Sequence, residues 1–260
     1  MEENQNLSDS EKDISNKEVI SSLKKKNWKS YFKEFFMLFL AVFCGFLAEN
    51  YRESLSAQKI EKEYILSLVE DLENDQINLN NYITDLHIGI NHMDTLITLL
   101  SDKEQLKLNV NHFYYLGRIA PRLITFSNNS RTFDQLKNSG GFRLIKSKEA
   151  SDQIMTYYNL IPFIRQLEDV HTQEFESFKE IGAKIFEPSA FRMMESEDGQ
   201  INQASTLQSL RTDNGELLKE LGIYAVYMNG TRRGILPVEE QLRTNGAALI
   251  KYLKQKYEIE

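Results

Sequence analysis

Hydrophobic residues gather in one uninterrupted run, residues 35–48, which reads Phe-Phe-Met-Leu-Phe-Leu-Ala-Val-Phe-Cys-Gly-Phe-Leu-Ala. No charged or strongly polar side chain interrupts it. A run of about 14 residues is short for a membrane-spanning helix, and it also fits a buried core helix or a signal peptide. The residues that flank the run therefore decide between these interpretations.

Aromatic residues flank the run at a spacing that fits a lipid bilayer. From Tyr31 to Tyr51 an α-helix would rise roughly 31 Å, close to the thickness of the hydrocarbon core. Trp and Tyr side chains prefer the membrane–water interface. We therefore predict a transmembrane helix within residues 23–52, in contact with the lipid bilayer. Its predicted anchoring side chains are Trp28, Tyr31, Phe35, Leu38, Phe39, Val42, Phe46 and Tyr51.

Two alternatives to a spanning helix stay open, a core helix and a cleaved signal peptide. The segment before the run is long and of mixed charge, and no small-x-small cleavage pattern follows it, which disfavours a signal peptide. The only cysteine, Cys44, lies inside the run behind the bulky Phe43, so a lipoprotein signal is not expected.

A cluster of lysines before the run sets the expected orientation. Basic residues after the run are instead spread among glutamates, so the positive-inside rule places the N-terminus in the cytoplasm. We predict a single-pass protein of the bacterial inner membrane, with a disordered cytoplasmic tail over residues 1–22 and a periplasmic domain over residues 53–260. The lysines of the cluster are Lys24, Lys25, Lys26, Lys29 and Lys33.

A second hydrophobic pattern repeats with a period of 3.5 residues over about five heptads, which is typical of a helix that packs one seam against other helices. No glycine or proline lies between Gly45 and Gly89, so we predict that the membrane helix continues into this segment. The seam can pack inside a bundle of the same chain, or against a second copy or another protein. Its members are Ile65, Val69, Leu72, Leu79, Ile83, Leu86, Ile90, Met93, Ile97 and Leu100, and Gln76 is the one polar exception.

A structural turn is predicted after a loop at residues 121–131. Thr132 and Gln135 have the spacing of a capping box, so a short helix should begin there. Gly140 and Gly141 should end it, because glycine adopts a positive φ at little cost.

Helical patterns also predict the remainder of an all-α domain. Residues 150–187 follow one helical stripe, with a kink expected at Pro162. A long loop is expected over residues 187–208. A last helix begins near Asp213 and should be kinked or broken around residues 230–237.

Composition supports the all-α fold class and narrows the possible partners. The chain has 260 residues, a net charge of −7, and only 4 prolines and 12 glycines. No basic stripe lies outside the lysine cluster, so a nucleic-acid partner is not expected.

Chemical motifs are scarce in this sequence. His87 and His92 are five residues apart, which separates them by about 140° on a helix instead of stacking them as metal ligands. The sequence has no zinc-protease motif, no phosphate-binding glycine loop and no Gly-x-Ser-x-Gly. We therefore expect no catalytic residues, no metal site, no cofactor and no enzymatic activity.

The expected function is that of a membrane-anchored interaction, scaffold or sensor protein, with a homo-oligomer or a protein partner on the helical seam. The alternative is a small-ligand receptor or enzyme whose site is assembled from scattered side chains. That alternative requires one pocket to join Arg131, Asp134 and Arg143 with Tyr114–Tyr115 or Tyr157–Tyr158. A weaker indication of an acidic ligand is the set Arg232, Arg233 and Arg243.

Residues 131–145, Arg-Thr-Phe-Asp-Gln-Leu-Lys-Asn-Ser-Gly-Gly-Phe-Arg-Leu-Ile, are more specific than a generic helix. With the membrane run and residues 63–75, they resemble an uncharacterised family of bacterial single-pass membrane proteins associated with Bacteroidota. The resemblance covers roughly residues 28–185 and implies the same topology and helical fold. Glu-Asn-Tyr at residues 49–51 departs from the family's pattern. The family implies no catalytic residues.

Overall fold

The computed structural model describes residues 3–206 and 208–259, with side chains from Trp28 onward. This described part contains helices and no strand, which confirms the all-α fold class. The chain divides into two compact units, Met1–Ile60 and Glu61–Glu260. The elements are α1 (Glu3–Ser101), α2 (Lys103–Leu108), α3 (Val110–Ile119), α4 (Arg131–Asn138), the 3₁₀ helix η1 (Gly141–Leu144), α5 (Lys148–Tyr158), α6 (Ile161–Ile185), α7 (Pro188–Met193) and α8 (Gly215–Tyr257).

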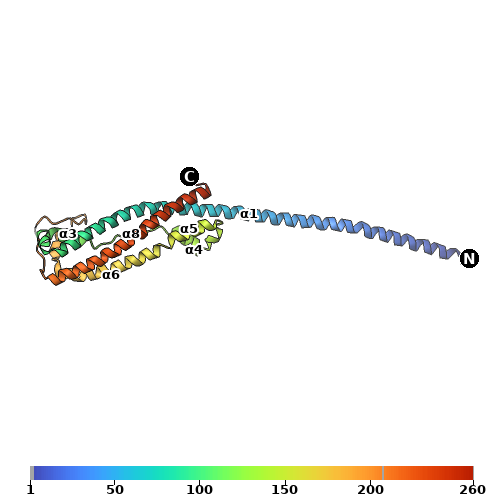
Figure 1. The fold of residues 1–260 in the computed structure, drawn as a ribbon. Coiled ribbons are helices and arrows are strands. Elements are labelled where there is room, and N and C mark those ends of the chain that lie inside the picture. Colours follow the sequence, from blue (N-terminus) through green and yellow to red (C-terminus); the bar gives the residue numbers. More distant parts are fainter. Residues whose placement is uncertain (1–2, 207, 260) are drawn as a thin grey trace. The chain divides into compact units, whose positions relative to one another are not determined.

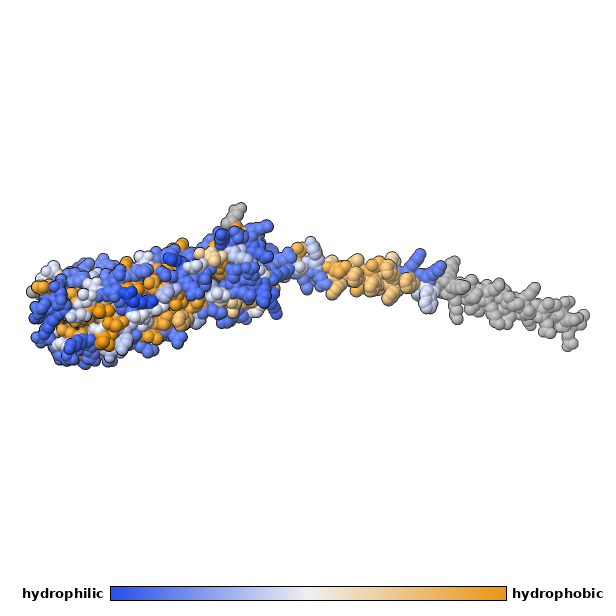
Figure 2. All heavy atoms as spheres, in the orientation of Figure 1, coloured by the Kyte–Doolittle hydropathy of each residue, from blue (hydrophilic) through white to orange (hydrophobic). Residues whose placement is uncertain are grey.

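Helix α1 contains the predicted membrane segment without a break. Its part from Trp28 to Ser101 is the one described helix that is long and apolar enough to cross a membrane. All eight predicted anchoring side chains are exposed, and Figure 2 shows the stretch as a continuous hydrophobic surface. The segment is therefore not a core helix of this chain. Residues 1–2 of the predicted tail lie outside the described residues, and disorder over residues 1–22 stays a prediction.

The periodic seam of α1 packs inside the unit Glu61–Glu260. Its members from Ile65 to Met93 are buried, and Ile97 and Leu100 are partly buried against a hydrophobic cluster. The long helices α6 and α8 lie side by side in the same unit (Figure 1). The seam therefore packs within the chain, and any partner of this helix has to bind another face.

Side-chain caps mark helix boundaries at two places. Asp102 follows the end of α1 and caps α2, because its carboxylate accepts hydrogen bonds from the backbone N–H groups of Glu104 and Gln105. The hydroxyl of Ser147 accepts from the N–H of Ala150 at 3.2 Å and caps α5. Such caps satisfy N–H groups that have no partner within the helix. Helix α2 itself was not predicted.

The structure differs from the prediction at Pro162, and at Pro237 it excludes the predicted break. The expected continuous helix over residues 150–187 is interrupted between α5 and α6, and Pro162 lies in the first turn of α6, where its missing N–H removes no helical hydrogen bond. Pro237 lies inside α8, which continues past it, so a break in that region is not present. The buried side chains of Ile235 and Leu242 on either side of Pro237 stabilise the helix there by packing. The predicted loop from residue 187 begins with the short helix α7.

Gly117 of α3 allows the ring of Phe186 to pack directly on the helix backbone. A Cβ atom at this position would overlap that ring and lie 2.8 Å from its Cε1 atom. The ring cannot move easily, because the rings of Phe113, Tyr114 and Phe191 lie 5.1, 5.3 and 5.0 Å from it between centroids. The close approach therefore requires glycine.

Replacing Gly117 with alanine should destabilise the protein by about 1–3 kcal/mol, because the added methyl group overpacks the core. The matched control is Gly230→Ala, at an exposed helical position where an added Cβ has no neighbour within 4 Å. That control should stabilise the protein by up to about 1 kcal/mol. Chemical denaturation measures both, and equal effects of the two substitutions would contradict the packing account.

Candidate functional site

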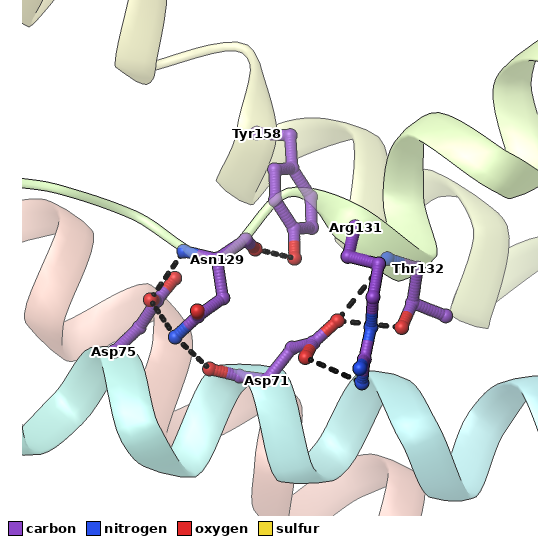
Figure 3. A network of polar contacts seen from close by, with 6 residues as sticks. All are labelled: Asp71, Asp75, Asn129, Arg131, Thr132 and Tyr158. Carbon is purple, nitrogen blue, oxygen red and sulfur yellow. Dashed lines mark hydrogen bonds and ion pairs between the residues drawn. The ribbon is translucent and has the colours of Figure 1, made fainter.

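The predicted turn is held by a carboxylate of α1. Asp71 accepts hydrogen bonds from the backbone N–H of Thr132 at 3.1 Å and from its hydroxyl at 2.5 Å (Figure 3). Helix α4 begins at Arg131 with Ser130 at its N-cap, so Thr132 lies inside the first turn and the predicted capping box with Gln135 is wrong. A carboxylate at this position also complements the positive end of the α4 dipole. Gly140 has a φ of 69°, as predicted for the end of this helix.

Asp75 lies one turn further along α1 and is fully buried. Its carboxylate accepts from the backbone N–H of Asn129 at 2.7 Å and from the Tyr157 hydroxyl at 3.0 Å. Burial raises the pKa of Asp75 to about 6, and the hydrogen bonds oppose that shift. The Tyr158 hydroxyl donates to the carbonyl of Asn129 at 3.0 Å (Figure 3). These groups satisfy one another, so they fasten the loop to α1 and leave little for a ligand to bind.

The two tyrosine pairs considered for a ligand pocket lie in separate hydrophobic clusters of the helical unit. Tyr157 and Tyr158 belong to one hydrophobic cluster, and Tyr114 belongs to another. The side chain of Arg131 is 76% exposed beside Asp71. The three arginines of α8 are also separate: Arg232 is buried, Arg233 pairs with Asp94, and Arg243 donates to Asn80.

A cavity of about 490 Å³ lies instead among residues of α3, α6 and α7, and we call it the aromatic pocket. Its volume is within the range of small-molecule sites. Four basic residues line it, and no acidic residue does. The lining residues are Gly117, Arg118, Arg122, Phe175, Phe178, Lys179, Gly182, Ala183, Phe186, Pro188, Phe191 and Arg211.

Two of the basic residues of the pocket have acidic partners outside it. Arg118 pairs with Glu195 at 2.8 Å, and its guanidinium lies 5.5 Å from the centroid of the Phe191 ring. Lys179 pairs with Glu176 at 2.6 Å, and its ammonium lies 4.9 Å from the Phe175 ring. These contacts hold the cations beside aromatic walls.

The other two basic residues of the pocket have no ion pair within the described part of the chain. Arg211 donates to the backbone carbonyl of Ala183 at 3.0 Å, and the side chain of Arg122 is exposed. The pocket therefore carries an excess of positive charge over an apolar floor. An anion with an apolar body fits both features.

Sequence patterns do not reveal this pocket, because its residues come from segments far apart in the chain. Phe175 and Phe178 were interpreted only as part of a buried helical stripe. One signal was present: Lys179 follows this pair of aromatic residues, and Gly182 leaves room one turn later. That pattern alone is also typical of an ordinary amphipathic helix.

Polar side chains also lie inside the helical bundle, and Glu239 of α8 is the most isolated of them. It is fully buried, and neither carboxylate oxygen has a hydrogen-bond partner among the described residues. Burial, and secondarily the charge of Glu168, raise the pKa of Glu239 to about 8. The Glu239 carboxyl is therefore mostly protonated at neutral pH.

Glu239 should make the protein less stable as pH rises. The pKa of Glu239 is about 8 in the folded state and 4.5 ordinarily. The contribution of the protonated carboxyl to the free energy of unfolding is therefore fully present below about pH 4.5 and is lost as pH rises through 8. Free energies of unfolding at pH 5 and pH 9 should differ by several kcal/mol at most, and Glu239→Gln should reduce that difference. Asp75 titrates in the same direction near pH 6, so part of the fall should remain. An unchanged fall in the variant would contradict the assignment.

Comparison with known proteins identifies no relative: no family model, curated protein or solved structure matches the chain. The resemblance to the bacterial membrane-protein family therefore stays a prediction.

Proposed function

We propose that this protein is a membrane-anchored, sensor-type receptor whose helical unit binds a small organic anion in the aromatic pocket. The observation that carries the proposal is the composition of the pocket. Four basic side chains line a cavity whose walls are phenylalanine rings, and no acidic side chain lines it.

The chemistry of the pocket suggests the class of ligand. An apolar or aromatic body would bury its surface against Phe175, Phe178 and Phe191, which contributes about 25 cal/mol per Å² and favours offset or edge-on ring contacts. A carboxylate or sulfonate group would bind the guanidinium groups of Arg122 and Arg211 through charge-assisted hydrogen bonds. Ligands of one or two rings suit a cavity of about 490 Å³.

The charge of Lys179 should contribute to binding without being required for the fold. We expect Lys179→Gln to weaken the binding of 2-naphthoate by about 3–10-fold at low ionic strength, because an attraction near the protein surface is lost. Isothermal titration calorimetry on the full chain in phosphatidylcholine nanodiscs measures this, with empty nanodiscs as the blank. The neutral 2-naphthamide should bind more weakly than the acid.

A matched control for this experiment is Lys219→Gln. Lys219 also pairs with a glutamate three residues earlier, at 2.9 Å, and lies outside the aromatic pocket. The control should bind 2-naphthoate as the unchanged protein does. Equal loss in both variants would indicate a general charge effect, and no binding by the unchanged protein would overturn the proposed function.

The membrane part of the proposal is a single-pass anchor in the bacterial inner membrane, with the N-terminus in the cytoplasm and the helical unit in the periplasm. It is supported by the apolar segment of α1 and by the lysines before it. An interaction or scaffold role for the same unit stays a prediction.

Reporter fusions should test this orientation. A reporter that is active only in the periplasm should give signal when fused after Glu260, and none when fused before Met1. The charge asymmetry across the apolar run is the physical reason. Activity of a cytoplasm-only reporter at the C-terminus would reverse the proposed topology.

A further inference from the structure

Arg232 of α8 is a fully buried cation with only neutral hydrogen-bond partners. Its Nε donates to Nε2 of His171 at 3.2 Å, and its Nη1 donates to the carbonyl of Gly89 at 3.0 Å. Its Nη2 donates to the carbonyl of Arg122 at 2.6 Å. A guanidinium has five N–H donors, so two remain after these contacts.

The charge of Arg232 is not compensated within the described residues. Burial lowers its pKa to about 10, which leaves it positive at neutral pH. His171 stays neutral, because burial and then the charge of Arg232 lower its pKa to about 3. Glu239 is two turns further along α8 and has a pKa of about 8, so at neutral pH it is mostly uncharged. Buried charges without a counter-ion are costly and uncommon in proteins.

Three carboxylates of α1 and α6 have partners other than Arg232. Glu168 pairs with Arg165 at 2.9 Å, and Glu174 accepts from the Thr231 hydroxyl at 2.9 Å. Asp94 pairs with Arg233 at 2.6 Å. None of these three acids forms an ion pair or a hydrogen bond with Arg232 in the described structure.

Arg232 lines a cavity of about 290 Å³, which lies between α1 and the segment that follows α3. The hydroxyl of Tyr82, a residue that is 4% exposed, is buried here without a hydrogen-bond partner. Arg122 and His92 also line the cavity, and Asp85 is its one acidic residue. The cavity is therefore lined by several side chains that can donate hydrogen bonds and by a single carboxylate.

We propose that this cavity is a second binding site, which takes a small oxyanion of the phosphate or sulfate class. Arg232 would supply charge and its two remaining N–H donors, and the Tyr82 hydroxyl would donate a third hydrogen bond. The absence of a side chain at Gly89 makes room for this arrangement, because a Cβ there would lie 3.2 Å from Nη1 of Arg232. The site does not depend on the aromatic pocket, although Arg122 lines both cavities.

The experiment measures the thermal stability of the full chain in phosphatidylcholine nanodiscs as sodium phosphate is added at constant ionic strength, with chloride as the reference. Phosphate or sulfate should raise the melting temperature in a saturable way, because an anion that binds only the folded state stabilises it. Tyr82→Phe should weaken the apparent affinity by about 10-fold, since it removes one hydrogen bond to a charged group. It should leave the fold intact, because that hydroxyl has no partner in the protein.

Two further variants make the result specific. Tyr227→Phe is the matched control, because Tyr227 is exposed and outside every cavity described above, and it should change nothing. Arg232→Met should abolish the anion effect. The proposal would be overturned if phosphate did not raise the melting temperature, or if it acted equally on the unchanged protein and on Tyr82→Phe. Loss of the effect in Lys179→Gln alone would assign the anion to the aromatic pocket instead.

Discussion

Burial of the apolar seam of α1 is the constraint on which the rest of the helical unit depends. Because the seam faces inward, the polar groups next to it in sequence are drawn into the interior and need partners there. Asp71 and Asp75 find them in the loop before α4, which they fasten to α1 through Thr132 and Asn129. Gly89 instead presents its backbone carbonyl to Arg232. Packing of the seam thus positions both the loop before α4 and the buried guanidinium of Arg232.

Two kinds of positive site follow from this architecture. The aromatic pocket has four cations, three of them exposed, over a floor of phenylalanine rings, so charge attracts a ligand and apolar surface holds it. The smaller cavity has a buried guanidinium and an unsatisfied hydroxyl, and it has little aromatic surface. The first arrangement suits an organic anion, and the second suits a compact oxyanion. Arg122 lies in both linings.

The sequence predicted the elements better than it predicted the sites. The 3.5-residue period correctly identified the buried seam, and Gly140 was correctly placed at a helix end. The capping box failed because α4 begins at Arg131, which places Thr132 inside the first turn, where Asp71, 61 residues earlier in the chain, accepts hydrogen bonds from its N–H and hydroxyl. Rules that use only residues close together in the sequence cannot include so distant a hydrogen-bond partner. The aromatic pocket was missed for the same reason, since its cations and rings meet only when distant helices pack together. Arg232 was noted only as one of three arginines, and its burial follows from tertiary packing.

Hydrogen exchange of the full chain in nanodiscs, measured by mass spectrometry with and without 2-naphthoate, tests the central claim most directly. Ligand in the aromatic pocket should slow exchange in peptides that cover residues 175–193, because it restricts local opening of α6 and α7. Peptides that cover residues 61–75 of α1 should not change. Protection confined to residues 61–75, or no protection at all at saturating ligand, would contradict the account.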